Sequence, residues 1–324
     1  MESEYATPKT LQEVILHFSS DDVCHEFMTN MRWPNGVACP RCGDTAVGFV
    51  KTRRIWNCKG CKKQFTVKVG TIFEDSPLKF QTWLPAFWLL ANAKNGISSC
   101  ELARSLDVTQ KTAWFMLHRI RTVLETGSVE KLSGEVEADE TYVGGKVRNN
   151  KRRIGKVKAG RGDSGKTVVF AVLERAEHEF EASRVQATVV PSAKKTVLSK
   201  EIRERISEFT TLYTDSWKGY RGLSSEYLHQ FVDHTVTYAM GQVHTNGIEN
   251  FWSLLKRGLN GTYISVEPFH LKRYIDEQVF RFNNRDDDDA GRFLVALENT
   301  EGRRLTYDEL TTSYEAYYDM VLPR

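Results

Sequence analysis

Three acidic side chains carry the chemistry that this sequence predicts. Asp139 lies in a strand-like run at 135–143, and Asp215 ends a second short strand at 212–215. Glu249 begins a helical segment at 248–257. Oxygen ligands suit Mg²⁺, and two such ions about 3.5–4 Å apart activate a nucleophile and stabilise a leaving oxygen in phosphodiester chemistry. We therefore expect the three carboxylates to meet around two Mg²⁺ or Mn²⁺ ions.

The segment that carries Glu249 has two faces if it is helical. One is polar and the other apolar, because residues three and four apart share a face. The polar face contains Asn246, Glu249, Ser253 and Lys256. The apolar face, suited to packing on a sheet, contains Ile248, Trp252, Leu255 and Leu259. We expect the polar stripe to point away from the sheet; the ordinary alternative for a lone acid is solvent exposure without function.

Four cysteines form two C-x-x-C pairs, Cys39 with Cys42 and Cys58 with Cys61, and fifteen residues separate the pairs. This spacing is typical of a four-cysteine zinc site, because each pair places two thiolates on one tight turn. Four protein ligands leave no open position on the metal, so we expect one structural zinc ion per chain. Two coincidental pairs of buried cysteines are the alternative.

Two helices separated by a tight turn are predicted between residues 99 and 121. The first covers 99–106, and Thr109 is placed to cap the second, which covers 111–121. A helix-turn-helix is a DNA-reading arrangement whose second helix contacts bases from its first residues. An ordinary helical hairpin is the alternative. The residues expected to contact bases are Gln110, Lys111 and Thr112.

The stretch 146–166 holds nine Lys or Arg residues and a single acid, Asp163. Charges of one sign at this density repel one another, which favours a polyanion nearby, and we expect a cationic loop that follows a DNA backbone. A solvated loop without a partner is the alternative. The side chains expected to contact DNA are Lys151, Arg152, Arg153, Lys156, Lys158, Arg161 and Lys166.

Residues 160–167 also match the phosphate-loop pattern G-x-x-x-x-G-K-[ST]. A phosphate loop follows an apolar strand and begins a helix. Here basic residues precede the pattern, and the β-branched run 168–173 follows it. We therefore expect no nucleotide binding, and dependence of activity on ATP would be the contrary result.

The length of 324 residues and the apolar content of 40% allow two or three domains with cores. No apolar run reaches the roughly 18 residues that cross a bilayer, and the first residues lack a signal pattern. The cysteine pattern fits a metal site and not a disulfide framework. The expected domains are a helical lead-in with a zinc ribbon at 1–70, a helix-turn-helix domain at 71–130, an α/β catalytic domain at 131–285 with a basic loop at 144–166, and a polar C-terminal tail at 286–324.

Between Arg32 and Asn283 the chain resembles the zinc-ribbon insertion-sequence transposases of the ISXO2-like DDE class, bacterial and archaeal relatives of the Merlin elements. The motifs that carry the resemblance are the two cysteine pairs, E-A-D-E-T-Y-V-G-G at 137–145, Y-T-D-S-W-K-G-Y at 213–220 and H-T-N-G-I-E-N-F-W at 244–252. The resemblance implies a ribonuclease H-like mixed sheet flanked by helices. It also implies that Asp139 and Asp215 hold metal and that Lys256 contacts phosphate or end DNA.

The third metal ligand stays open between two residues. Some members of this family use Asn, and this chain has both Asn246 and Glu249 on one helix face. We expect Glu249, because a charged oxygen binds Mg²⁺ better than an amide.

The resemblance further implies a magnesium-dependent endonuclease and strand transferase. It would bind the terminal inverted repeats of a mobile element, hydrolyse the ends and join the 3′-hydroxyl to target DNA. Two ends must be held together, so we expect at least a dimer on DNA, in a cytoplasmic, nucleoid-associated protein without membrane or nucleotide partners. The alternatives are a zinc-ribbon DNA-binding regulator and a domesticated, catalytically silent transposase.

Overall fold

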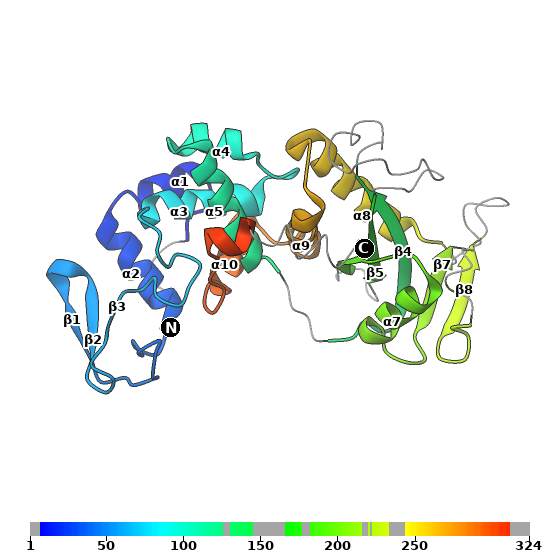
Figure 1. The fold of residues 1–324 in the computed structure, drawn as a ribbon, viewed down its shortest axis with the longest axis horizontal. Helices are drawn as coiled ribbons and strands as arrows, with labels where there is room; N and C mark the ends of the chain where they lie inside the picture. The colour runs from blue at the N-terminus through cyan, green and yellow to red at the C-terminus, as the bar shows by residue number, and fades with distance from the viewer. Residues whose placement is uncertain are drawn as a thin grey trace. The chain divides into compact units, whose positions relative to one another are not determined.

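A computed structural model describes residues 7–125, 130–144, 166–176, 182–215, 220, 222–232 and 244–311. The chain divides into two compact units, which Figure 1 shows in the colours of the sequence. The first, here called the N-terminal unit, comprises residues 1–125 and 287–313. The second, the α/β unit, comprises residues 126–286 and 314–324.

The N-terminal unit begins with two helices and a small antiparallel sheet of order β1-β2-β3. Arg54, in the turn after β1, donates hydrogen bonds of 2.6 Å to both Asp21 and Asp22 at the start of the second helix. Trp56 and Phe65, which are partners in the register of β2 and β3, stack with ring centroids 5.7 Å apart. The elements are α1 (Leu11–His17), α2 (Asp21–Arg32), β1 (Val47–Val50), η1 (Lys51–Arg53), β2 (Ile55–Cys58) and β3 (Gln64–Phe65).

In the described part of this unit, three further helices pack against α3, which is buried along most of its length. Residues 289–298 lie in the region that the sequence analysis separates as a polar tail, yet they form a helix that packs on α3. The ring of Phe293 lies 5.4 Å from that of Trp88, centroid to centroid. The elements are α3 (Phe80–Asn92), α4 (Ser99–Leu106), α5 (Gln110–Val123) and α10 (Asp289–Glu298).

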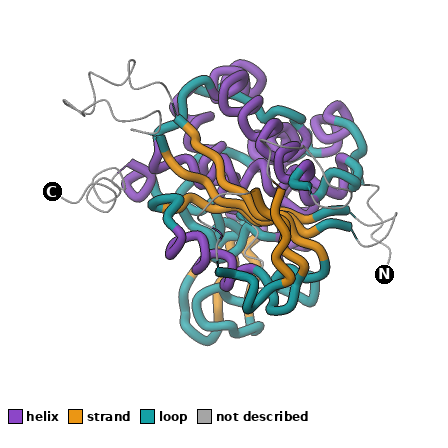
Figure 2. Tube along the Cα trace, turned by 90° about the vertical axis from the view of Figure 1, so that its right-hand side faces the viewer, coloured by secondary structure: helices purple, strands orange, loops and turns teal. Residues whose placement is uncertain are grey.

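The α/β unit is built on a five-stranded mixed sheet of order β6-β5-β4-β7-β8. The first three strands of that order pair antiparallel, whereas β4, β7 and β8 run parallel to one another. Figure 2 shows its strands side by side with a marked twist. The strands are β4 (Glu135–Val143), β5 (Thr167–Glu174), β6 (Arg184–Val190), β7 (Thr211–Asp215) and β8 (Leu228–Val232).

Helices cover both faces of this sheet. On β5, alternate residues point to opposite faces, so Phe170 belongs to the core beneath one helix and Val169 to the core beneath two others. One face is covered by α7 (Lys195–Arg205), and the other by α8 (Asn246–Arg257) and α9 (Leu271–Asn283). Two short helices, η3 (Gly258–Tyr263) and η4 (Pro268–His270), connect α8 to α9. The mixed α/β class expected from the sequence is confirmed.

None of the helices in the described ranges has the length and apolar character needed to cross a membrane.

Candidate functional site

The alternation of side chains along β4 separates its acidic residues. Glu137 contacts the start of α8, and Asp139 contacts Trp252 of the same helix. Glu140 points to the opposite face, where the hydroxyl of Tyr220 donates to it at 2.5 Å. The two-residue period of a strand predicts this orientation, in which Glu140 and Asp139 lie on opposite faces of the sheet.

Asp139 and Asp215 lie on neighbouring parallel strands. The register pairs Glu137 of β4 with Tyr213 of β7. Two residues further along each strand, on the same face, are Asp139 and Asp215. Parallel pairing thus brings together two carboxylates that are 76 residues apart in the chain (215 − 139).

The third acid comes from α8, whose two faces match the sequence prediction. Ile248, Trp252 and Leu255 are buried against the sheet. The indole Nε1 of Trp252 donates a 2.9 Å hydrogen bond to Oδ2 of Asp139. The polar stripe faces outward, and its exposed members are Asn246, Glu249, Ser253 and Lys256.

Electrostatics connect the three acids. Burial, together with the weaker effects of the nearby carboxylates of Asp215 and Glu249, raises the pKa of Asp139 to about 6, against the lowering effect of the Trp252 hydrogen bond. Asp139 is therefore close enough to both other acids for their charges to affect its ionisation.

The spacing of these acids bears on the kind of metal site they fit. Among the described residues, four cysteines are the one group of three or more Cys, His, Asp or Glu side chains with ligand atoms all within 4.8 Å of one another. The three acids are therefore not arranged around a single ion. Two ions about 3.5–4 Å apart need a wider set of ligands than one ion does.

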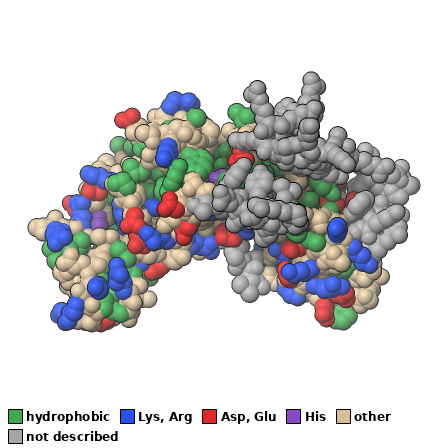
Figure 3. All heavy atoms as spheres, viewed as in Figure 1, with side chains coloured by type: hydrophobic (Ala, Val, Ile, Leu, Met, Phe, Trp, Pro, Cys, Tyr) green, Lys and Arg blue, Asp and Glu red, His purple; other side chains and the backbone are tan. Residues whose placement is uncertain are grey.

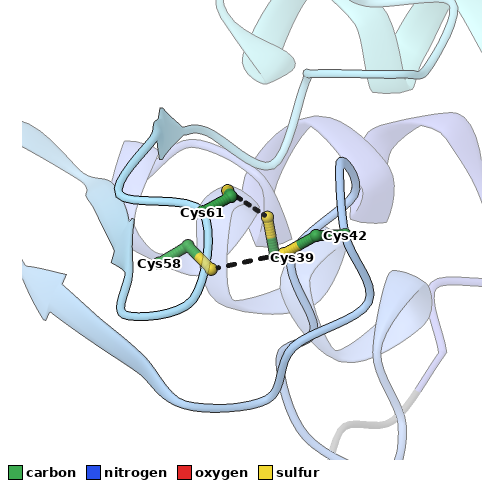
Figure 4. Close-up of side chains that lie close together, drawn as sticks. All are labelled: Cys39, Cys42, Cys58 and Cys61. Carbon is green, nitrogen blue, oxygen red and sulfur yellow. Dashed lines mark hydrogen bonds between the residues drawn. The ribbon is translucent and has the colours of Figure 1, made fainter.

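The four cysteines converge as predicted (Figure 4). Sγ of Cys39 lies 3.8 Å from Sγ of Cys61, and Sγ of Cys42 lies 3.5 Å from Sγ of Cys58. Four sulfurs at about 2.3 Å from a tetrahedral zinc ion lie about 3.8 Å apart, so this cluster fits the metal. With all four positions filled by thiolates, the zinc is structural.

Two glycines allow these cysteine turns to form. Gly43 has a φ of +76° and donates its N–H to the carbonyl of Cys39 at 2.8 Å. A Cβ on Gly60 would lie 2.4 Å from Oδ2 of Asp44, so a side chain there would force the Asp44 carboxylate to move. Both positions therefore favour glycine for geometric reasons.

The helix pair α4 and α5 forms with the predicted turn and cap. The side chain of Thr109 accepts a hydrogen bond from the N–H of Thr112, which caps α5. Gln110 and Lys111 are exposed at the start of that helix. Gln110 donates to Ser99 of α4 at 2.8 Å, and the Lys111 ammonium lies 4.6 Å from the centre of the Tyr307 ring. DNA contact by these three residues stays a prediction.

Most of the predicted basic loop lies outside the described residues. This applies to Lys151, Arg152, Arg153, Lys156, Lys158 and Arg161. Lys166 is described, and β5 begins at the next residue, so the phosphate-loop pattern is followed by the predicted strand and not by a helix. Figure 3 shows other Lys and Arg side chains around β1–β3, where the exposed ones are Lys51, Arg53, Lys59, Lys62 and Lys63.

The sequence reasoning missed the role of Glu137, a buried acid of β4 on the same face as Asp139. Its carboxylate accepts hydrogen bonds from Arg175 at 2.9 Å and from the first turn of α8. One signal was available, because Glu137 and Asp139 are two residues apart on a strand and so share a face.

Comparisons with known proteins agree with this geometry. Residues 131–283 match the ISXO2-like transposase domain, and residues 19–64 match the transposase zinc-ribbon domain. A protein of the transposable element ISH50 from Halobacterium salinarum is 28% identical over 256 residues, which cover 75% of this chain and 84% of that protein. A transposase-like protein from Haemophilus influenzae is 33% identical over 102 residues, which cover 31% of this chain and 82% of that protein. The chain belongs to the zinc-ribbon, ISXO2-like family of insertion-sequence transposases.

Proposed function

We propose that this chain is a Mg²⁺-dependent DNA transposase that hydrolyses the ends of its element and joins the freed 3′-hydroxyl to target DNA. The observation that carries the proposal is the placement of Asp139 and Asp215 on one face of neighbouring parallel strands, with α8 bonded to Asp139 through Trp252. Three antiparallel strands followed by two parallel ones, with helices on both faces, agree with a ribonuclease H-like fold.

In this proposal Asp139, Asp215 and Glu249 hold two Mg²⁺ or Mn²⁺ ions. When bound, these ions would activate the attacking oxygen and stabilise the leaving one. The chain's own residues orient the carboxylates. Trp252 donates to Oδ2 of Asp139 and so restricts the rotation of that carboxyl group. Asn246, on the same stripe as Glu249, is the alternative third ligand.

Other parts of the chain would hold DNA. Lys256 is exposed about two helical turns beyond Glu249 on the polar stripe, where it would contact phosphate near the cleaved bond. The zinc ribbon, the helix-turn-helix formed by α4 and α5, and the basic loop would bind the inverted repeats. Synapsis of two ends requires at least a dimer on DNA.

Cleavage of a supercoiled plasmid that carries the DNA flanking the coding region on both sides tests the proposal. The wild-type protein should nick at the ends of inverted repeats with Mg²⁺ and stop on addition of EDTA. Asp215→Asn should still bind the ends but lose nicking by at least about a thousandfold, because a carboxylate ligand is gone. Glu208→Gln, an exposed acid of the same unit, is the matched control and should cleave like the wild type.

Two outcomes count against the proposal. Full nicking by Asp215→Asn would remove that residue from the site. End binding by the wild-type protein without any EDTA-sensitive nicking would instead support a DNA-binding regulator or a silent transposase.

A further inference from the structure

The helix that carries Glu249 is held at its first turn by a carboxylate from another element. In the described part of the chain, the N-cap residue Thr245 makes no side-chain cap hydrogen bond. Instead, Oε2 of Glu137 on β4 accepts the backbone N–H of Ile248 at 2.8 Å. The first N–H groups of a helix lack partners within the helix and carry partial positive charge, so a buried carboxylate is a suitable cap.

A second attachment lies one turn along the helix. Trp252 lies four residues after Ile248 on α8, and Asp139 lies two residues after Glu137 on β4. The indole of Trp252 donates a hydrogen bond to Asp139. Four helical residues rise about 6 Å, and two strand residues rise about 6.6 Å, so the two spacings match. The two bonds therefore fix the position of α8 along β4, and Glu249 lies between them.

The buried charge of Glu137 is balanced by Arg175, which follows β5. Its Nε donates to Glu137 at 2.9 Å, and one terminal nitrogen donates to Glu135 at 3.2 Å. The other terminal nitrogen donates to the backbone oxygen of His244 at 2.7 Å and lies 2.9 Å from Nδ1 of the same residue. One guanidinium thus connects β4 with the residue two positions before α8.

The same guanidinium also contacts β7. Its central carbon lies 4.2 Å from the centre of the Tyr213 ring, a cation–π contact. The Tyr213 hydroxyl donates to Glu135 at 3.2 Å, which ties β7 to β4 at the same place. Tyr213 is two residues before Asp215, so this contact sits beside the second metal-binding aspartate.

We propose that Arg175 is a positioning residue for the carboxylates. It joins the strands that carry Asp139 and Asp215 to the start of the helix that carries Glu249, and so sets the spacing of all three. This inference rests on the proposed function. A lysine would keep the charge but not the contacts, because only guanidinium presents its donors in a planar fork.

The close approach at Gly247 supports the same reading. A Cβ there would lie 3.0 Å from Oε2 of Glu137 and 3.1 Å from Cδ2 of Leu173. Gly247→Ala therefore requires the Glu137 carboxylate or the start of α8 to shift by a few tenths of an ångström without changing any charge, so it perturbs the same attachment independently.

The full-length protein and three variants, Arg175→Lys, Gly247→Ala and Arg184→Lys, test the inference. Arg184 is the matched control, because it forms an exposed ion pair with Glu174 in the same unit. The measurements are amide hydrogen exchange of residues 246–257 without metal, the Kd for Mn²⁺, and kcat and KM for plasmid nicking. Arg175→Lys should speed exchange at the first turn of α8 and weaken Mn²⁺ binding roughly 10–100-fold. Nicking should lose kcat at an unchanged KM for DNA. Gly247→Ala should act in the same direction with a smaller effect, and Arg184→Lys should match the wild type.

The possible failures are distinguishable. Wild-type protein that does not bind Mn²⁺ refutes the proposed function and, with it, the role of Arg175. If the wild type binds Mn²⁺, unchanged exchange and unchanged Mn²⁺ affinity in Arg175→Lys overturn the positioning role alone. If Arg175→Lys does not fold, Gly247→Ala decides by the same two readouts.

Discussion

Replacing Asp139 with Asn should stabilise the protein at neutral pH when no divalent ion is present, even though the change should abolish activity. Burial and, less strongly, the charges of Asp215 and Glu249 raise the pKa of Asp139 to about 6. Above that pH the folded protein nevertheless carries the ionised carboxylate, in surroundings that disfavour it. Asparagine has nearly the same shape and no charge, and its Oδ1 can accept the Trp252 hydrogen bond.

The size of the gain follows from the pKa. A rise from 3.8 to about 6 is about two units, each worth about 1.4 kcal/mol, so the penalty on the ionised form is at most about 3 kcal/mol. The folded state binds this proton more tightly than the unfolded state. The proton's stabilising effect is therefore complete below pH 3.8 and is lost as the pH rises to about 6. The advantage of Asp139→Asn should be near zero at about pH 4 and reach its full size above pH 6.

Thermal unfolding in EDTA across this pH range measures the effect. In a domain of this size, about 3 kcal/mol corresponds to roughly 6–12 °C in Tm, as an upper limit. Adding Mg²⁺ should raise the Tm of the wild type at neutral pH, because a ligand that binds only the folded state stabilises it, and should leave Asp139→Asn nearly unchanged. Glu208→Gln, an exposed acid in the same unit, serves as control and should shift stability by less than about 0.5 kcal/mol.

Two results would refute this reasoning. A difference between Asp139→Asn and the wild type that does not vary with pH would show that the carboxylate ionises as easily in the folded protein as in water. A variant less stable than the wild type at neutral pH would show that the charge is already compensated inside the protein.

Three shorter predictions concern other residues. Cys42→Ser should lose zinc, measured by metal analysis, and make residues 39–61 sensitive to protease, because three ligands do not complete the site; one zinc retained per chain would contradict the assignment. Trp252→Phe removes the N–H that lowers the pKa of Asp139, so Mg²⁺ should begin to stabilise the protein at a higher pH than in the wild type, and an unchanged pH profile of Tm would argue against it. Lys256→Ala should leave the unfolding temperature unchanged because the side chain is exposed. The slope of the logarithm of the end-binding constant against the logarithm of salt concentration should become smaller by about one. An unchanged slope would mean that Lys256 does not contact phosphate.

Local features of this fold were predictable from the sequence. The β-branched run at 168–173 forms most of β5, which covers Thr167–Glu174. This run is continuously apolar because both of its faces are covered, one by α7 and the other by α8 and α9. The Thr109 cap and the buried and exposed faces of α8 were also predictable from the sequence, because each depends on residues within a few positions of one another.

Contacts between distant segments were not predictable in the same way. Glu137 caps a helix that begins more than one hundred residues later, and its bond to Ile248 spans 111 positions. The alternation of side chains along β4 does not indicate which helix packs against Glu137. The packing of α10 on α3 is equally long-range, since most of the α/β unit lies between Trp88 and Phe293 in the sequence.

Glu137 and Asp139 show why residue type alone did not separate ligand from support. Both are acids on one face of β4, two residues apart, and both bond to α8. Glu137 has a cation, Arg175, at 2.9 Å, and its charge is neutralised within the protein. The charged groups that most affect Asp139 are two further acids, which add to the unfavourable effect of burial. A buried carboxylate among like charges is stabilised by an external cation, whereas one paired with arginine gains little from it. The charge environment therefore favours Asp139 over Glu137 as the proposed metal ligand, and it agrees with helix support by Glu137.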